Sequence, residues 1–176
     1  MERNLILDAK HGRDDAFAKI VNRYSPILKR ICIAAGVPID DISDVVQEVF
    51  IKVYRFIGQV EVSTFQFWLY KITINTARDM GRKQLVWNNK FDLMQKDQII
   101  HSSSYSSSVE ERIMNKADCE RLIDCIIALD AKYQIPLVLH FFHFLKYEDI
   151  SSITGDKAST IKVRVLRAKK KIKQKF

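Results

Sequence analysis

One stretch of the chain cannot contribute to a hydrophobic core, and it lies between two stretches that can. From His101 to Ser108 the chain reads HSSSYSSS, with six serines in the seven positions after His101. A segment of this kind has no apolar period and is typical of a flexible linker. The flanking sequences repeat apolar residues every three or four positions, as amphipathic helices do. The 176-residue chain therefore predicts two small helical domains joined by a flexible linker.

The composition agrees with an all-α fold. Five Gly and three Pro are too few for the many tight turns of a β-sandwich or barrel. Hydrophobic residues make up 47% of the chain and charged residues 28%, a balance typical of globular proteins. No run of about 18 uncharged apolar residues occurs, so we expect no membrane insertion. The N-terminus lacks the layout of an export signal, which predicts a cytoplasmic location.

Three helices are expected before the linker. An apolar stripe from Phe17 to Ala35 predicts the first, closed by Gly36 and Pro38, and Pro26 could start a new helix inside it. A second helix is expected from a cap at Asp40-Asp41 to Ile57, with an apolar face that includes Tyr54. A third should begin near Ser63-Thr64 and run to about Arg82. Its expected core stripe is Phe65, Trp68, Leu69, Ile72 and Thr76, whereas Phe67, Tyr70 and Ile74 have no evident core role.

Two polar stripes on these helices are candidate surfaces. Asp41, Asp44 and Glu48, with Gln47 beside them, form an acidic stripe suited to a protein partner or to plain solvation. A basic line on the third helix, flanked by Phe67, Trp68 and Tyr70, suits an unstacked single strand. Its members are Lys71, Asn75, Arg78 and Arg82. The competing interpretation is that the aromatic residues are core and the charges solvated.

The second half has the pattern of a helix-turn-helix. Helices are expected over Val109–Leu129 and from about Tyr133 to Phe144, with Pro136 in the first turn of the latter. A short helix with Tyr147, Ile150 and Ile153 on its apolar side ends at Gly155, which can adopt a left-handed cap. A basic helix follows, and this succession is the helix-turn-helix layout. Its predicted inward residues are Ile161, Val165, Leu166, Ala168 and Ile172.

Positive charge is concentrated in that second half. Residues 112–176 carry 14 basic and 7 acidic side chains, whereas residues 1–83 carry 13 and 10. In a helix-turn-helix the second helix enters the major groove, where Arg164 and Lys162 could reach guanine. Lys170 would lie near phosphates. The residues expected to face DNA are Thr160, Lys162, Val163, Arg164, Arg167 and Lys170. The alternative is an amphipathic helix with a solvated basic face.

Patterns typical of catalysis or metal binding are weak. His140 and His143 could share a helix face, but no carboxylate or Cys accompanies them. Cys32, Cys119 and Cys125 do not form a CxxC motif and are expected to be free thiols. The phosphate-binding and hydrolase motifs are absent from the sequence. We therefore expect no catalytic residue, no metal and no cofactor.

Taken in order, the stretches Asp40–Ile57, Ser63–Lys83 and Leu129–Lys173 resemble those of a bacterial RNA polymerase sigma factor of the extracytoplasmic-function (ECF) group. DDISDVVQEVFIKVYRFI (Asp40–Ile57) is similar to the helix that binds core polymerase. STFQFWLYKITINTARDMGRK (Ser63–Lys83) is similar to the helix that melts and reads the minus-ten element. LDAKYQIPLVLHFFHFLKYEDISSITGDKASTIKVRVLRAKKKIK (Leu129–Lys173) is similar to the domain that reads the minus-thirty-five element.

The resemblance implies a division of the chain and a set of partners. Residues 1–84 would form a domain that binds core polymerase and the minus-ten element, residues 85–110 a linker, and residues 111–176 the minus-thirty-five domain. The partners would be the β′ clamp helices and β flap of the polymerase, promoter DNA and, as a further candidate, an anti-sigma factor. The loop Val60–Gln66 would capture a flipped base. Core polymerase would bind Asp41, Asp44, Gln47 and Glu48, and the minus-ten strand would bind Phe65, Trp68, Lys71, Asn75, Arg78 and Arg82.

Three departures from the family pattern bear on promoter choice. Ile74 stands where an Arg is common, Val163 where a small polar residue is common, and Asp156-Lys157 replaces an apolar residue and Ser in the turn. We expect Asp156 to replace the missing Ser as helix cap. Two other functions stay open at this point. One is a stand-alone helix-turn-helix regulator that dimerises through the Asp40–Ile57 helix, and the other is a protein-interaction module that does not bind DNA.

Overall fold

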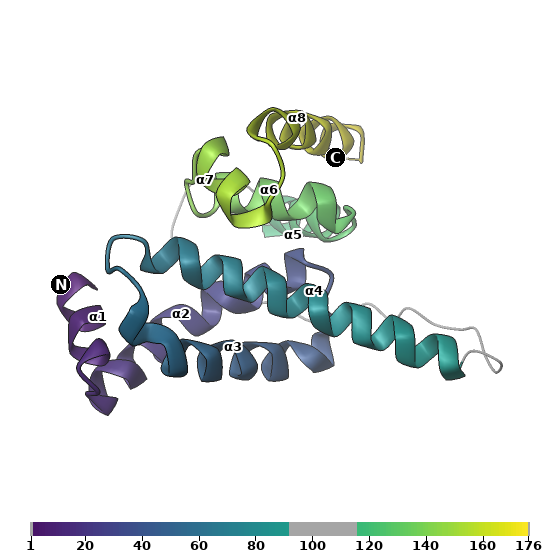
Figure 1. Cartoon of the computed structure of the whole chain (residues 1–176). Coiled ribbons are helices and arrows are strands. Elements are labelled where there is room, and N and C mark those ends of the chain that lie inside the picture. Colours follow the sequence, from purple (N-terminus) through teal and green to yellow (C-terminus); the bar gives the residue numbers. More distant parts are fainter. Residues whose placement is uncertain (1, 92–115, 176) are drawn as a thin grey trace.

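The computed structural model describes residues 2–91 and 116–175, and every regular element in these two ranges is helical. Figure 1 shows α1 to α4 as one layer of the molecule and α5 to α8 as a second group lying over α4. The predicted all-α fold with two helical domains is confirmed. Within these ranges, no helix combines the length and the apolar character needed to cross a bilayer.

The first domain is built around α2 (Asp14–Ala34), which contacts every other helix of its layer. The helix α1 (Glu2–Lys10) packs on α2 at one end. α3 (Ile42–Phe56) and α4 (Phe65–Phe91) pack on α2 and on each other. Short 3-10 turns at Ile39–Asp41 and Ile57–Gln59 lie at the two ends of α3. Gly36, at φ +80°, follows the end of α2 as predicted.

Pro26 does not start a new helix, so that prediction is wrong. α2 runs through it from Asp14 to Ala34. Pro26 has no N–H to donate to the preceding turn, but Tyr24 and Leu28 on either side are buried in the core. Their packing outweighs the loss of one helical hydrogen bond.

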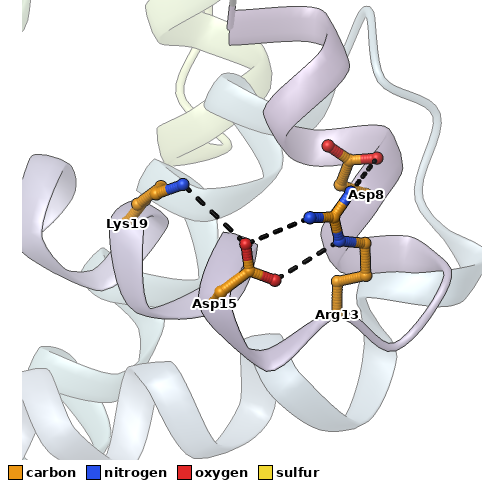
Figure 2. Close-up of polar contacts among 4 residues, drawn as sticks. All are labelled: Asp8, Arg13, Asp15 and Lys19. Carbon is orange, nitrogen blue, oxygen red and sulfur yellow. Dashed lines mark hydrogen bonds and ion pairs between the residues drawn. The ribbon is translucent and has the colours of Figure 1, made fainter.

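A surface network holds the corner between α1 and α2 (Figure 2). Arg13 donates from Nε and Nη2 to the two carboxylate oxygens of Asp15, at 3.3 and 3.2 Å, and its Nη1 lies 3.7 Å from Asp8. Lys19 lies 3.8 Å from Asp15 one turn further along α2. The hydrogen bond from Arg13 lowers the pKa of Asp15. Because all four side chains are solvent-exposed, the network orients the corner rather than stabilising the fold strongly.

The predicted third helix is longer than expected, since α4 continues to Phe91. Of the expected linker, residues 85–91 are therefore helical, and residues 92–110 lie outside the described residues. The prediction for Tyr70 and Ile74 is also corrected. Both are fully buried, together with Phe65, Leu69 and Thr73, because α4 packs against α2 and α3 on one side and against the second domain on another.

The second domain consists of α5 (Lys116–Ile127), α6 (Ala131–Phe141), α7 (Tyr147–Thr154) and α8 (Ala158–Lys175). The expected start of the first of these at Val109 lies outside the described residues. α6 starts two residues earlier than predicted, so Pro136 lies in its second turn rather than its first. The core comes mainly from α6, α7 and α8. Its fully buried members include Leu139, Ile150, Ile153, Ile161, Val165 and Ala168.

Leu166 is an exception to the predicted inward face of α8. It is 56% exposed, whereas its neighbour Val165 is buried. Adjacent helical residues differ by about 100° around the axis, and α6 and α7 cover only the side that carries Ile161, Val165 and Ala168.

Candidate nucleic-acid interface

The turn between α7 and α8 positions the helix that was predicted to read DNA. Gly155 adopts φ +80°, and its N–H donates to the carbonyl of Ser151 at 2.9 Å. This is the left-handed cap predicted from the sequence, and it ends α7 sharply. At the other end of α7, the carboxylate of Asp149 accepts from the N–H of Lys146 at 3.2 Å. Both ends of the short helix are therefore defined, and α8 leaves the turn at a fixed angle.

One face of α8 is available for DNA. Lys162, Val163, Arg167 and Lys170 are exposed, while Thr160 and Arg164 are partly exposed. Arg164 donates from Nη1 to the carboxylate of Asp156 at 2.5 Å. The carboxylate of Asp156, which the sequence predicts as a helix cap, is the acceptor in this ion pair. The pair extends the Arg164 side chain back along α8 toward the turn.

The predicted line on α4 divides into exposed and enclosed residues. Lys71 and Asn75 are exposed, whereas Trp68 and Arg78 are half-buried. Phe65 is completely buried, and its ring packs edge-on against that of Tyr24 at 5.8 Å. The structure therefore places Phe65 in the core and not on the predicted DNA surface. The backbone of Arg82 continues α4, but its side chain lies outside the described residues.

A pocket of about 560 Å³ lies beside the loop that joins α3 to α4. Its walls come from Glu2 and Arg3 of α1, from Tyr24, and from the loop residues Glu61 to Ser63 with Gln66. Lys10, the last residue of α1, donates from Nζ to the carbonyl of Val60 at 2.7 Å and ties α1 to this loop. The loop was predicted from the sequence and α1 was not, although Leu5, Ile6 and Ala9 lie three and four residues apart, the spacing of a helix with one buried face.

Tyr24 orders the floor of this pocket. Its hydroxyl donates to Oε1 of Glu2 at 2.5 Å. Burial, reinforced by that carboxylate, raises the pKa of Tyr24, so the phenol stays protonated and continues to donate. The pocket therefore has polar groups on its walls and an opening to solvent.

The acidic stripe lies on the solvent side of α3. Asp44, Gln47 and Glu48 are exposed and Asp41 is partly exposed. Glu48 lies 3.6 Å from Lys52, four residues further along the helix. The apolar side of α3, with Val45, Val49 and Val53, is buried inside the chain. That side is not free to form a dimer seam, which removes the main support for a dimeric regulator.

Tyr54 differs from the prediction for α3. It is 59% exposed rather than inward, and its hydroxyl lies 3.4 Å from Asp14. Ile51 and Phe56 are exposed on the same helix. α3 therefore presents an acidic stripe and an apolar margin on its outer side, a combination suited to a protein partner.

The histidines and cysteines of the described residues form no shared metal-ligating cluster. His140 bonds the carbonyl of Leu145 at 2.8 Å and stacks on Tyr147, whereas His143 lies against Tyr70 of the other domain. Cys32 is buried, and burial raises the pKa of its thiol to about 12. Across residues 2–91 and 116–175, no cluster of three metal-ligating side chains is found.

Sequence comparisons match both halves of the chain to one family. The model of sigma-70 region 2 matches residues 20–85, and that of sigma-70 region 4 matches residues 119–172. The chain is 30% identical over 180 residues to the ECF RNA polymerase sigma-E factor of Haemophilus influenzae, covering 99% of this chain and 95% of that protein. It is 33% identical over 132 residues to the RNA polymerase sigma factor SigV of Bacillus subtilis, covering 74% and 73%.

Solved structures show a similar fold. CnrH in complex with the cytosolic domain of CnrY aligns with a TM-score of 0.66 at 21% identity, over 98% of this chain and 95% of CnrH. The sigma factor RpoE of Bartonella quintana, in complex with the anti-sigma factor NepR, aligns with a TM-score of 0.71 at 23% identity, over 90% and 95%.

Proposed function

The chain belongs to the sigma-70 family of RNA polymerase sigma factors, in its ECF group, and from this premise we propose which surfaces perform each step. It is a transcription initiation factor that directs RNA polymerase to promoters. We assign core binding and the minus-ten element to residues 1–84, and the minus-thirty-five element to residues 111–176. Residues 85–110 connect the two, with α4 extending into the beginning of this segment.

The observation that carries the proposal is the face of α8. Its buried side is apolar, and its open side presents Lys162, Val163, Arg167 and Lys170 beside a sharp glycine turn. Such a helix fits the major groove with its N-terminal residues on the base edges. Thr160, Lys162, Val163 and Arg164 contact bases in this proposal, and Arg167 and Lys170 contact a base or phosphates.

The minus-ten step is proposed for α4 and the adjoining loop. Lys71, Asn75 and Arg78 lie at helical spacing along one line, with Trp68 beside it, and Arg82 continues it in sequence. Basic and aromatic groups together suit an unstacked strand. The pocket beside Val60–Gln66 is large enough for a base and has donors and acceptors on its walls. Phe65 supports this surface from the core.

The acidic stripe on α3 is proposed as the docking surface for core polymerase. Asp41, Asp44, Gln47 and Glu48 would bind the clamp helices of β′, and the second domain would bind the β flap. An anti-sigma factor is a further proposed partner. We propose that the chain works in the cytoplasm, carries out no bond chemistry itself and needs no cofactor, because its role is to position the polymerase on DNA.

Core-dependent transcription tests the proposal. Purified chain, core RNA polymerase and promoter DNA selected with that holoenzyme should give transcripts that start at one position. A double charge reversal, Asp44→Lys with Glu48→Lys, should abolish co-purification with core, because like charges would then meet. A matched reversal at the exposed Glu120 of α5 should leave core binding intact. Wild-type chain that fails to bind core would contradict the assignment.

A further inference from the structure

The turn before α8 carries a carboxylate that holds an arginine of the proposed DNA-binding face. Nη1 of Arg164 donates to Oδ2 of Asp156 at 2.5 Å. The two side chains are 26% and 28% exposed, whereas the surface pair of Arg13 and Asp15 joins side chains that are 58% and 55% exposed. Because partial enclosure reduces the screening of the attraction by water and salt, the Arg164–Asp156 pair is held more firmly than a surface pair.

The turn fixes Asp156 relative to the core of its domain. The N–H of Asp156 donates to Oγ1 of Thr154 at 3.4 Å, and the Thr154 hydroxyl donates to the carbonyl of Ile150 at 2.9 Å. Ile150 is completely buried. Gly155, between Thr154 and Asp156, has the left-handed conformation that ends α7. The carboxylate of Asp156 is therefore placed by the turn and does not swing on a loose loop.

The ion pair determines where the guanidinium of Arg164 lies. Arg164 follows Ala158, the first residue of α8, by six residues, which is about 9 Å along the helix axis. Side chains of a helix lean toward its N-terminus, and the bond to Asp156, which precedes α8, directs Arg164 the same way. The N-terminal part of such a helix is the part that meets base edges. The guanidinium is thus brought toward the end of α8 that would read DNA.

The bonding pattern leaves Arg164 able to contact a base. The bond to Asp156 uses Nη1, and a guanidinium carries five N–H donors in a planar fork. The edge formed by Nε and Nη2 is the one that can donate two parallel hydrogen bonds to O6 and N7 of guanine. An arginine that is already held in one geometry loses less conformational entropy when it makes this contact.

The same ion pair limits binding that does not depend on sequence. Such binding grows with the number of phosphates that basic side chains neutralise. The charge of Arg164 is balanced by Asp156, on a face that already presents Lys162, Arg167 and Lys170 to solvent. Arg164 therefore adds less to the attraction for arbitrary DNA than an unpaired arginine would. The pair favours one base contact and withholds a charge from the phosphates, which increases specificity.

We propose that Asp156 is a positioning residue that sets specificity at one base pair of the minus-thirty-five element, by presenting Arg164 to a guanine. The inference rests on the proposed role of α8 in reading that element, and adds the residue that determines how sharply one base pair is read. Asp156 is also among the departures from the family pattern seen in the sequence. With an apolar residue at position 156, Arg164 would lose this carboxylate and could turn to a phosphate instead.

Three variants of the full-length chain test the positioning role: Asp156→Ala, Arg164→Ala and the two combined. Glu148→Ala is the matched control, because it removes one exposed carboxylate from the first turn of α7 in the same domain. Holoenzyme formed with each chain is titrated with promoter DNA selected by the wild type, with a panel of its single-base variants and with a duplex of random sequence, at several salt concentrations.

Asp156→Ala should lower discrimination about tenfold at the same base pair that Arg164→Ala affects. It should also tighten binding to the random duplex and steepen the salt slope of log K by about 1, since one more cation reaches the phosphates. These opposite signs separate positioning from a structural role, because a damaged turn would weaken both kinds of binding. In the Arg164→Ala chain, adding Asp156→Ala should change discrimination no further. Glu148→Ala should discriminate like the wild type.

A measurement on the free chain separates this inference from the proposed function. The heteronuclear NOE of the Arg164 Nε–H, identified by the loss of its signal in Arg164→Ala, should be high in the wild type and low in Asp156→Ala. Circular dichroism checks folding, and Asp156→Asn, which keeps the shape of the side chain and removes its charge, replaces Asp156→Ala if the latter loses helix content.

Unchanged discrimination in Asp156→Ala, a uniform loss of affinity for all duplexes, or an Arg164 equally ordered in both chains would overturn the positioning role. A wild-type holoenzyme that selects no promoter would instead contradict the proposed function. The NMR comparison on the free chain would still show whether Asp156 holds Arg164.

Discussion

At the scale of single residues, Arg164 and Lys170 lie on the same open face of α8 but in different surroundings. Arg164 is partly enclosed and paired with Asp156, whereas Lys170 is exposed. A guanidinium held by a carboxylate is pre-oriented for bidentate contact with guanine. An exposed ammonium further along the helix instead acts as a charge near phosphates. The two residues should therefore differ in how they affect promoter choice.

We expect Arg164→Ala to cost about 1–3 kcal/mol at one base pair of the minus-thirty-five element and to relax specificity there. Lys170→Ala should weaken all sequences alike and reduce the salt slope of log K by about 1. Holoenzyme binding to a panel of single-base promoter variants, at several salt concentrations, measures both effects. Equal losses across the whole panel for both variants would show that Arg164 is not a base reader.

Phe65 belongs to the core and should behave as a core residue. Its ring is completely buried against Tyr24 and Trp68. Phe65→Ala should lower the free energy of unfolding by about 3–5 kcal/mol, measured by chemical denaturation. Phe65→Leu should cost less and keep minus-ten binding. If the Phe65→Leu chain had normal stability but lower affinity for single-stranded DNA, Phe65 would have to be assigned a DNA contact.

At the scale of the elements, the α7–α8 turn depends on backbone conformation at one residue. Gly155 has φ +80°, and a Cβ there would meet nothing within 4 Å. Gly155→Ala should therefore be destabilising by about 1–2 kcal/mol through left-handed backbone strain alone. Gly58→Ala, with equally open space and no positive φ, is the matched control and should be near neutral. Thermal unfolding of the two variants compares them, and equal melting temperatures would argue against strain at Gly155.

At the scale of the whole molecule, the packing of the α5–α8 domain against the α1–α4 domain should depend on pH through His143. Tyr70 from α4 and Arg30 from α2 are the groups that face it. Burial, with a smaller contribution from the charge of Arg30, lowers the pKa of His143 below its usual 6.5. At pH values between this lowered pKa and 6.5, the chain therefore binds more protons when its two domains are apart than when they are packed together. Closure is favoured above that window and weakens as the pH falls through it.

Small-angle X-ray scattering measures this effect as a change in the radius of gyration of the full-length chain. The measurements are made at about pH 8 and about pH 5.5, on either side of the ordinary histidine pKa. The wild type should expand at the lower pH, whereas His143→Ala should have the same dimensions at both. His11→Ala should respond like the wild type, since it retains His143. Expansion of the His143→Ala chain on acidification would assign the response to another group.

The interfaces were only partly predictable, and the reason differs from residue to residue. The outward positions of Lys162, Arg167 and Lys170 follow from the period of α8, since their neighbours Ile161 and Val165 have to be buried. Tyr70 and Ile74 were misjudged because α4 is covered on more than one side, and a helical period shows only one apolar face. The wall that α1 adds to the pocket depends on how two segments about 60 residues apart in the chain come together.

The sequence by itself determined most of the helices after α1, the two-domain division and the helix-turn-helix, because helical period, the glycine cap and the serine-rich segment act over a few neighbouring residues. Only the tertiary structure decided that Phe65 and Tyr70 are buried, that α2 continues through Pro26, and that Arg78 bonds Thr154 of the other domain. These outcomes depend on packing between segments far apart in the chain, which outweighs local preference and leaves no local pattern.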